Sequence, residues 1–107
     1  MNTMNRIAIE CISIARDHGF TPRDDIVDLE KEKWYLAAKI ALIHSEASEM
    51  LEALRVLDKE ELAEEGIDVL IRTLEFLKCL GIDIDKEIRK KMEVNRNRTY
   101  MHGGKAF

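Results

Sequence analysis

Apolar residues recur along this chain with the period of an α-helix in four successive segments. The first predicted helix spans Met4–His18, and its apolar residues form one stripe of Ile7, Cys11, Ile14 and Ala15. Gly19 follows at the position where a residue in the left-handed conformation commonly ends a helix. Residues 20–28 then form a connection to the next segment.

A second and a third helix follow, separated by a short turn. The second is predicted over Leu29–Leu57, which contains neither proline nor glycine. Asp58 stands three residues before Glu61, which is the spacing of an N-terminal capping box. A third helix is therefore predicted to begin there and to run to Leu80, with Gly81 ending it.

The last helical segment completes the fold prediction. Asp83 or Asp85 caps a fourth helix that runs to about Asn97. Four helices joined by short links predict an all-α protein, an antiparallel helical bundle that oligomerises because one small bundle offers only a shallow cleft. We expect one domain over residues 1–98 and an irregular tail over residues 99–107.

Composition narrows the class of protein. The 107 residues are 46% apolar and 36% charged, with one proline and five glycines, which favours an ordered helical domain over disorder. No apolar run approaches the roughly 20 residues of a membrane span, and no signal-peptide pattern opens the chain. With Cys11 and Cys79 expected to be free buried thiols, a cytoplasmic location is expected. The net charge of −4 argues against binding to polymeric nucleic acid.

Two pairs of acidic residues stand at helical spacing. They are Glu46 with Glu49 and Glu65 with Asp68. Residues three apart share one helix face, so two antiparallel helices could direct four carboxylates into one gap. Such charges repel unless a cation neutralises them, and Mg²⁺ or Mn²⁺ prefers oxygen ligands and can hold a phosphate.

The two pairs differ in their surroundings. On the predicted second helix, the first pair is flanked by the apolar residues Leu42, Met50 and Ala53. Carboxylates on a face that favours burial indicate a functional site. The second pair belongs to a wholly charged stripe formed by Glu61, Glu65, Asp68 and Arg72. Such a stripe is typical of a solvated face, with Arg72 as a salt-bridge partner of Asp68.

Basic residues gather at the other end of the chain. Residues 86–105 contain seven basic and two acidic residues. An acidic middle and a basic end could meet one ligand from opposite sides, the first through a metal ion and the second through phosphate. Lys91, Asn95 and Arg98, spaced by four and three, share one helix face on which cations can oppose phosphate oxygens.

These motifs together resemble the MazG-like, all-α nucleoside triphosphate pyrophosphatases, a superfamily that includes the dimeric dUTPases and the phosphoribosyl-ATP pyrophosphatases. The family motif is an ExxE helix, then an ExxD helix, then a Lys, Asn and Arg set on the last helix. The matching elements are Glu46-Ala-Ser-Glu49, Glu65-Gly-Ile-Asp68 and the set of Lys91, Asn95 and Arg98. The resemblance covers residues 37–98, over half of the chain.

The resemblance implies both an activity and roles for residues. Mg²⁺, or Mn²⁺ as a substitute, would be bound by Glu46, Glu49, Glu65 and Asp68. The triphosphate would be bound by Lys91, Asn95 and Arg98. Water would attack the α-phosphorus and release a monophosphate and pyrophosphate, with Glu46 or Glu49 as the catalytic base. A homodimer or homotetramer, and clearance of unwanted nucleotides, are implied as well.

Other functions stay open on the residues alone. Phosphoribosyl-ATP hydrolysis is the nearest alternative, and a non-enzymatic assembly or partner-binding module with solvated acidic stripes is a second. A carboxylate-bridged iron or manganese protein normally uses Glu-x-x-His pairs, which neither acidic pair provides. Phe20, Trp34 or Tyr35 could stack on a base, whereas His44 is read as a packing or surface residue.

Overall fold

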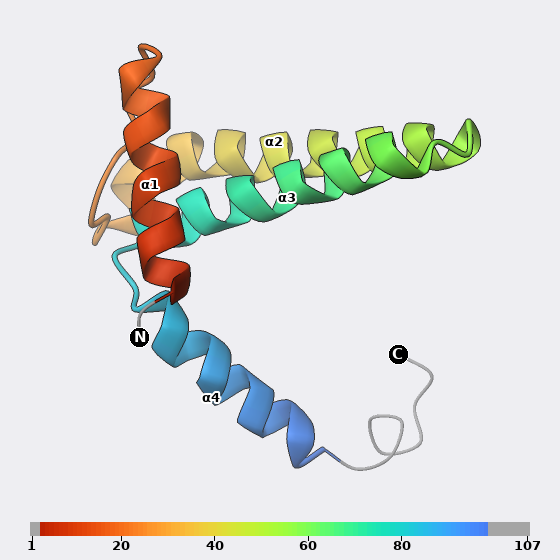
Figure 1. The fold of residues 1–107 in the computed structure, drawn as a ribbon. Coiled ribbons are helices and arrows are strands. Elements are labelled where there is room, and N and C mark those ends of the chain that lie inside the picture. The colour runs from red at the N-terminus through yellow and green to blue at the C-terminus, as the bar shows by residue number, and fades with distance from the viewer. Residues whose placement is uncertain (1–2, 99–107) are drawn as a thin grey trace.

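The fold is all-α, as the sequence predicts. A computed structural model describes residues 3–98, and this part of the chain forms helices and no strands (Figure 1). The helices are α1 (Thr3–Asp17), α2 (Leu29–Arg55), α3 (Lys59–Cys79) and α4 (Ile84–Arg96). Each ends one or two residues before its predicted end, and the predicted tail, 99–107, lies outside the described residues. Within 3–98, no helix is long and apolar enough to cross a membrane.

Aspartates cap three of the helices. The side chains of Asp28, Asp58 and Asp83 each accept the backbone N–H of the third residue beyond, at 3.1, 3.0 and 3.2 Å. Each satisfies a donor that has no partner in the first turn of a helix. The prediction of Asp58 as an N-cap is confirmed. Of the two alternatives for α4, Asp83 is the cap.

The helix ends use left-handed backbone. Gly19 has φ 90° and Gly81 has φ 70°, which confirms both predicted stops. A Cβ atom on Gly81 would lie 2.9 Å from Oδ1 of Asp25, so the residue there has neither space nor a suitable φ for a side chain. Leu57, in the turn between α2 and α3, also has a positive φ of 56°. That conformation ends α2 at Arg55 and not at Leu57.

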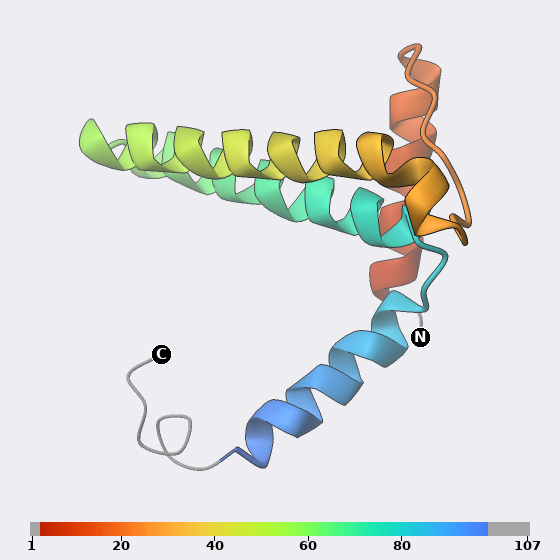
Figure 2. The same cartoon turned by 180° about the vertical axis from the view of Figure 1, so that it is seen from behind.

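Only two of the helices lie side by side along their length. α2 and α3 form a long antiparallel hairpin, which both views show extending away from the rest of the molecule (Figures 1 and 2). α1 crosses α3 near the base of this hairpin, and α4 leaves the base in a different direction. α4 touches α1 and α3 but not α2. A bundle of four parallel or antiparallel helices is therefore not formed within one chain. The predicted bundle is not confirmed, and of its helices only α2 and α3 pack antiparallel along their length.

The core lies where α1, α3 and α4 meet. Ala8, Leu74 and Ile84 form its buried centre, and Met4, Leu77 and Ile82 pack around them. Cys79 is also buried and Cys11 is partly buried, both as free thiols, as predicted. Along the outer half of the hairpin, Ala53 is the single buried residue among those described. One chain therefore leaves much of its apolar surface uncovered.

The stripe predicted for α1 is right for two of its four residues, since Cys11 and Ala15 are half-buried whereas Ile7 and Ile14 are exposed. The fully buried residues of α1 are Ala8 and Ile12. α1 carries apolar residues on most of its circumference, so its periodicity allows more than one buried face. The crossing with α3 selects the face of Ala8, whose small side chain permits close approach.

The start of α1 and the start of α4 hold each other through polar groups, an arrangement that we call the N-terminal clasp. Asp85, which is buried, accepts the backbone N–H groups of Met4 and Asn5, both at 3.0 Å. The side chain of Asn5 donates to Asp83 at 2.8 Å and accepts the N–H of Ile84 at 2.8 Å. The clasp thus satisfies backbone donors of both helices and fixes the direction in which α4 leaves the core.

We expect Asp85→Asn to lower the thermal unfolding midpoint near neutral pH and to weaken the acid dependence of stability. Hydrogen bonds from the N–H groups of Asn5 and Met4 hold the pKa of Asp85 below its usual range. Its contribution to the free energy of unfolding is therefore complete above the unfolded-state pKa of about 4 and is lost as the pH falls through the lower folded-state pKa. Urea unfolding across acidic pH measures this change.

Asp17→Asn is the matched control, because Asp17 is exposed at the last residue of α1. This variant should keep the acid dependence of the wild type. Wild-type acid dependence in Asp85→Asn would contradict the role of the clasp.

Candidate functional site

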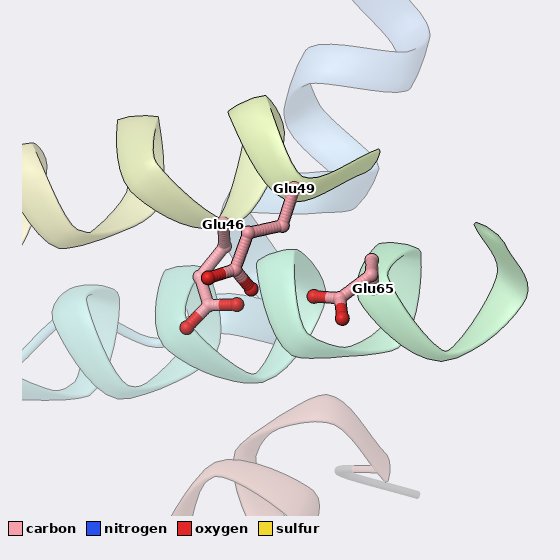
Figure 3. A group of neighbouring side chains, drawn as sticks. All are labelled: Glu46, Glu49 and Glu65. Carbon is pink, nitrogen blue, oxygen red and sulfur yellow. The ribbon is translucent and has the colours of Figure 1, made fainter. Parts of the chain in front are cut away.

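Three of the four predicted metal ligands converge between α2 and α3. Glu46 and Glu49 come from successive turns of α2 and Glu65 comes from α3, and their carboxyl groups face one another in the gap between the two helices (Figure 3). One carboxylate oxygen from each lies within 4.8 Å of the others. We call this group the carboxylate cluster. Its geometry follows directly from the spacing of three on α2 and from the antiparallel course of α3.

Burial within the cluster is uneven. The side chain of Glu46 is 13% exposed, so the prediction that its face favours burial is confirmed for this residue. Glu49 is exposed, although the same prediction was made for it. Oε2 of Glu65 is buried and has no hydrogen-bond partner within the described residues. A buried oxygen with no partner destabilises the fold, so this position favours a cation or a proton.

The neighbouring carboxylates also affect the protonation of Glu65. A hydrogen bond with Glu49, followed by burial and by the charges of Glu49, Asp68 and Glu46, raises the pKa of Glu65 from its ordinary 4.5 to about 7. Two carboxyl groups at this distance cannot easily both be charged. The arrangement of the three carboxyl groups therefore favours the protonated form of Glu65 near neutral pH.

Asp68, the fourth predicted ligand, is not brought into the cluster. It is exposed one turn beyond Glu65 on α3 and lines an open cavity of about 330 Å³ together with Cys11, His18 and Phe20. Its charge still acts on Glu65, because it contributes to the raised pKa of that residue. The sequence predicted that Glu65 and Asp68 belong to a solvated face. This is correct for Asp68, whereas Glu65 joins Glu46 and Glu49 in the cluster.

Arg72 lies beside the cluster with different partners from those predicted. Its Nε is 3.7 Å from Oε1 of Glu46, and one of its terminal nitrogens is 3.5 Å from Oε1 of Glu75. The expected salt bridge to Asp68 is not among its contacts in the described part of the chain. Arg72 therefore orients Glu46, a role that sequence reasoning missed because the contact crosses from α3 to α2.

The predicted phosphate-binding residues are distant from the cluster in one chain. Lys91 and Asn95 lie on α4, Arg98 lies just beyond it, and all three are exposed. Because α4 does not touch α2, the acidic middle and the basic end do not meet within a single molecule.

A cavity of about 210 Å³ adjoins the cluster. Tyr35 and Phe20 line it, together with Arg72, which also contacts Glu46. Arg23 and Lys39 lie over the ring of Tyr35, at 4.9 and 5.3 Å from its centroid. Of the three candidates for base stacking, Tyr35 and Phe20 are therefore placed at a cavity. Trp34 is 77% exposed and does not line it, and His44 is exposed, as expected.

Comparison of the chain with protein-family models, with curated proteins and with solved structures finds no significant match.

We expect the metal-free protein to lose stability as the pH rises from about 4.5 through about 7, and Glu65→Gln to remove this loss. The pKa of Glu65 is higher in the folded protein than in the unfolded chain, so the folded state binds the extra proton. The contribution of this proton to the free energy of unfolding is complete below the unfolded-state pKa of Glu65. It is lost as the pH rises and the proton dissociates from the folded protein. Urea unfolding in the presence of a chelator, at a series of pH values, measures the slope.

Glu64→Gln is the control for this prediction, because Glu64 is the exposed neighbour of Glu65 on α3. It should retain the pH dependence of the wild type. An unchanged slope in Glu65→Gln would mean that the shared proton is not held there.

Proposed function

We propose that this protein is a Mg²⁺-dependent nucleotide pyrophosphohydrolase of the MazG-like type. The observation that carries the proposal is the convergence of Glu46, Glu49 and Glu65 from two helices. Oxygens around one Mg²⁺ lie about 2.1 Å from the ion and therefore within roughly 4.2 Å of one another. The cluster, at 4.8 Å or less, needs only small side-chain rotations to reach that spacing.

The chemistry of the donors also fits a hard cation. The three ligands offer carboxylate oxygens only, and the buried Oε2 of Glu65 has no partner within the described residues. Asp68 is the fourth ligand on the family resemblance, after a change in its side-chain position. Mn²⁺, which takes the same ligands, would substitute for Mg²⁺.

The proposed reaction breaks the bond between the α-phosphorus and the oxygen that bridges to the β-phosphorus. A bound Mg²⁺ would neutralise phosphate charge and lower the pKa of the attacking water. Glu46 or Glu49 accepts the proton of that water. Lys91, Asn95 and Arg98 bind the triphosphate and stabilise the negative charge of the departing pyrophosphate.

The proposed site for the nucleoside is the cavity next to Arg72. The cavity with Tyr35 and Phe20 is continuous with Arg72, whose Nε is 3.7 Å from Glu46. An aromatic ring at its wall can stack on a base while the phosphates extend toward the carboxylates. This arrangement supports a nucleoside triphosphate as the substrate. On the family resemblance, we propose the clearance of unwanted nucleotides in the cytoplasm as the role.

Assembly into a homodimer or homotetramer is part of the proposal. Leu51, Leu54 and Ile67 are exposed on the hairpin, where one chain leaves α2 and α3 without a covering layer. Neighbouring subunits would cover these residues and complete the bundle. The same exposure favours a second candidate, a helical assembly module with no catalytic activity. Pyrophosphate release across the eight common ribo- and deoxyribonucleoside triphosphates separates the two.

We expect Glu49→Gln to abolish pyrophosphate release while the far-ultraviolet circular dichroism spectrum stays that of the wild type. The change removes a charge from the cluster and alters the shape of the side chain little. Glu30→Gln is the matched control on the same helix, because Glu30 is exposed in the first turn of α2, pairs with Lys33 and lies far along the helix from the cluster. The control should hydrolyse the substrate at the wild-type rate. Turnover by Glu49→Gln at that rate would overturn the assignment of the ligand.

We expect Lys91→Ala to raise the KM for the triphosphate about tenfold or more, with little effect on Mg²⁺ affinity. The loss of one charge-assisted contact to phosphate corresponds to roughly 1.5–3 kcal/mol. Lys90→Ala is the control, because Lys90 is also exposed but lies on another face of α4. Steady-state kinetics and calorimetric titration with Mg²⁺ measure the two effects. Equal changes in both variants would contradict a specific role for Lys91.

A further inference from the structure

α4 is held only at its beginning. The clasp and the burial of Ile84 and Asp85 fix its first residues, whereas every residue from Lys86 to Arg98 is exposed. The helix has 13 residues, and isolated helices of that length are marginal in water. Its outer turns therefore need a packing partner that one chain does not supply.

One face of α4 is suited to packing against a protein surface. Ile84, Ile88 and Met92 follow one another at intervals of four, and Lys91 and Asn95 lie on the same side. Ile84 is 2% exposed, whereas Ile88 and Met92 are 45% and 54% exposed. The apolar stripe thus begins in the core and continues onto an uncovered surface. Lys91 forms no ion pair within the described residues.

The surface of opposite character is the end of the hairpin, residues 46–68. This segment contains nine acidic and two basic residues, a net charge of −7, whereas residues 86–98 contain six basic and two acidic residues, a net charge of +4. The hairpin end also exposes apolar side chains, among them Leu51, Leu54, Leu57 and Ile67. Both surfaces therefore combine uncovered apolar groups with charge, and the charges are of opposite sign.

We propose that the face of α4 that carries Ile88, Lys91 and Met92 docks on the acidic end of the α2–α3 hairpin in a second copy of this chain. Burial of the apolar groups drives the contact, and the opposite charges select the partner surface. A two-fold arrangement makes the contact twice, since each copy offers both surfaces.

Two other arrangements are less favourable. Docking of α4 on the hairpin of its own chain would require the clasp to break, because the clasp directs α4 along a course that does not touch α2 (Figure 2). Two hairpin ends packed directly on each other would bring together two segments of net charge −7. A second copy presenting its basic helix avoids both costs.

The contact has a consequence for the site, which rests on the proposed function. Lys91 and Asn95 of one subunit would approach the carboxylate cluster of its partner. Cations and carboxylates that one chain keeps apart would then face the same triphosphate. The site would be complete only in the assembled protein.

The test uses two complementary charge-reversed variants of the full chain. The first carries Arg89→Glu, Lys91→Glu and Arg98→Glu, which change the net charge of residues 86–98 from +4 to −2. The second carries lysine in place of four exposed glutamates, Glu52, Glu60, Glu61 and Glu64, which changes the net charge of residues 46–68 from −7 to +1. Light scattering after size exclusion should give twice the 12.4 kDa chain mass for the wild type and the single-chain mass for each variant. An equimolar mixture of the two should recover the double mass, because both contacts are then between opposite charges.

A second comparison isolates the apolar part of the contact. Met92→Glu should be monomeric, whereas Val27→Glu should keep the double mass, because Val27 is 91% exposed in the segment before α2 and lies outside both surfaces. Circular dichroism establishes that each variant folds. A monomeric wild type, a Met92→Glu variant of double mass, or a mixture that stays monomeric would each overturn the proposal.

The masses do not depend on catalysis, so they remain informative if no triphosphate is hydrolysed. Where the wild type is active, a mixture of Glu49→Gln with Lys91→Ala, assayed at a triphosphate concentration well below KM, should be more active than the average of the two variants measured separately. About a quarter of the wild-type activity is expected from random pairing, in which half of the molecules are mixed dimers with one intact site of two. Double mass without regained activity would overturn the shared site and leave the docking surface intact.

Discussion

The antiparallel contact between α2 and α3 is the interaction on which the rest of the molecule depends. The short turn at Val56–Asp58 reverses the chain and brings two acidic helices together along their length. This contact places Glu46, Glu49 and Glu65 in one gap and so creates the electrostatic conflict that distinguishes the site. Hydrogen bonding with Glu49, burial and the neighbouring carboxylates raise the pKa of Glu65 to about 7, in keeping with that conflict. A structural hairpin without a ligand would be more stable with fewer charges at this position.

The local structure could be predicted from the sequence with good accuracy, because the signals are themselves local. Asp58 and Gly81 mark helix ends through their own backbone and side-chain chemistry, and the structure uses both as predicted. The spacing of Glu46 and Glu49 likewise requires no tertiary information. The meeting of this pair with Glu65 required only that α2 and α3 be antiparallel neighbours.

The features that were mispredicted or missed all depend on contacts between elements distant in sequence. The buried face of α1 is set by its crossing with α3. The apolar pattern around Ile7 and Ile14 does not indicate where that crossing occurs, and both residues are exposed. Arg72 was assigned to Asp68 on its own helix but pairs with Glu46 on another. The direction of α4 depends on Asn5 and Asp85, which are 80 residues apart in the sequence. Periodicity describes one helix at a time and therefore could not show where Lys91 and Asn95 would lie.

The turn between α2 and α3 contains a leucine in a conformation that destabilises the single chain. Leu57 adopts a left-handed backbone with φ 56° and is 84% exposed. For a residue with a Cβ atom this conformation costs roughly 1–2 kcal/mol, and glycine would adopt it without that cost. An exposed leucine also adds nothing to the core of its own chain. Glycine at this position would make the single chain more stable. The presence of Leu57 is therefore explained by something other than the stability of one chain.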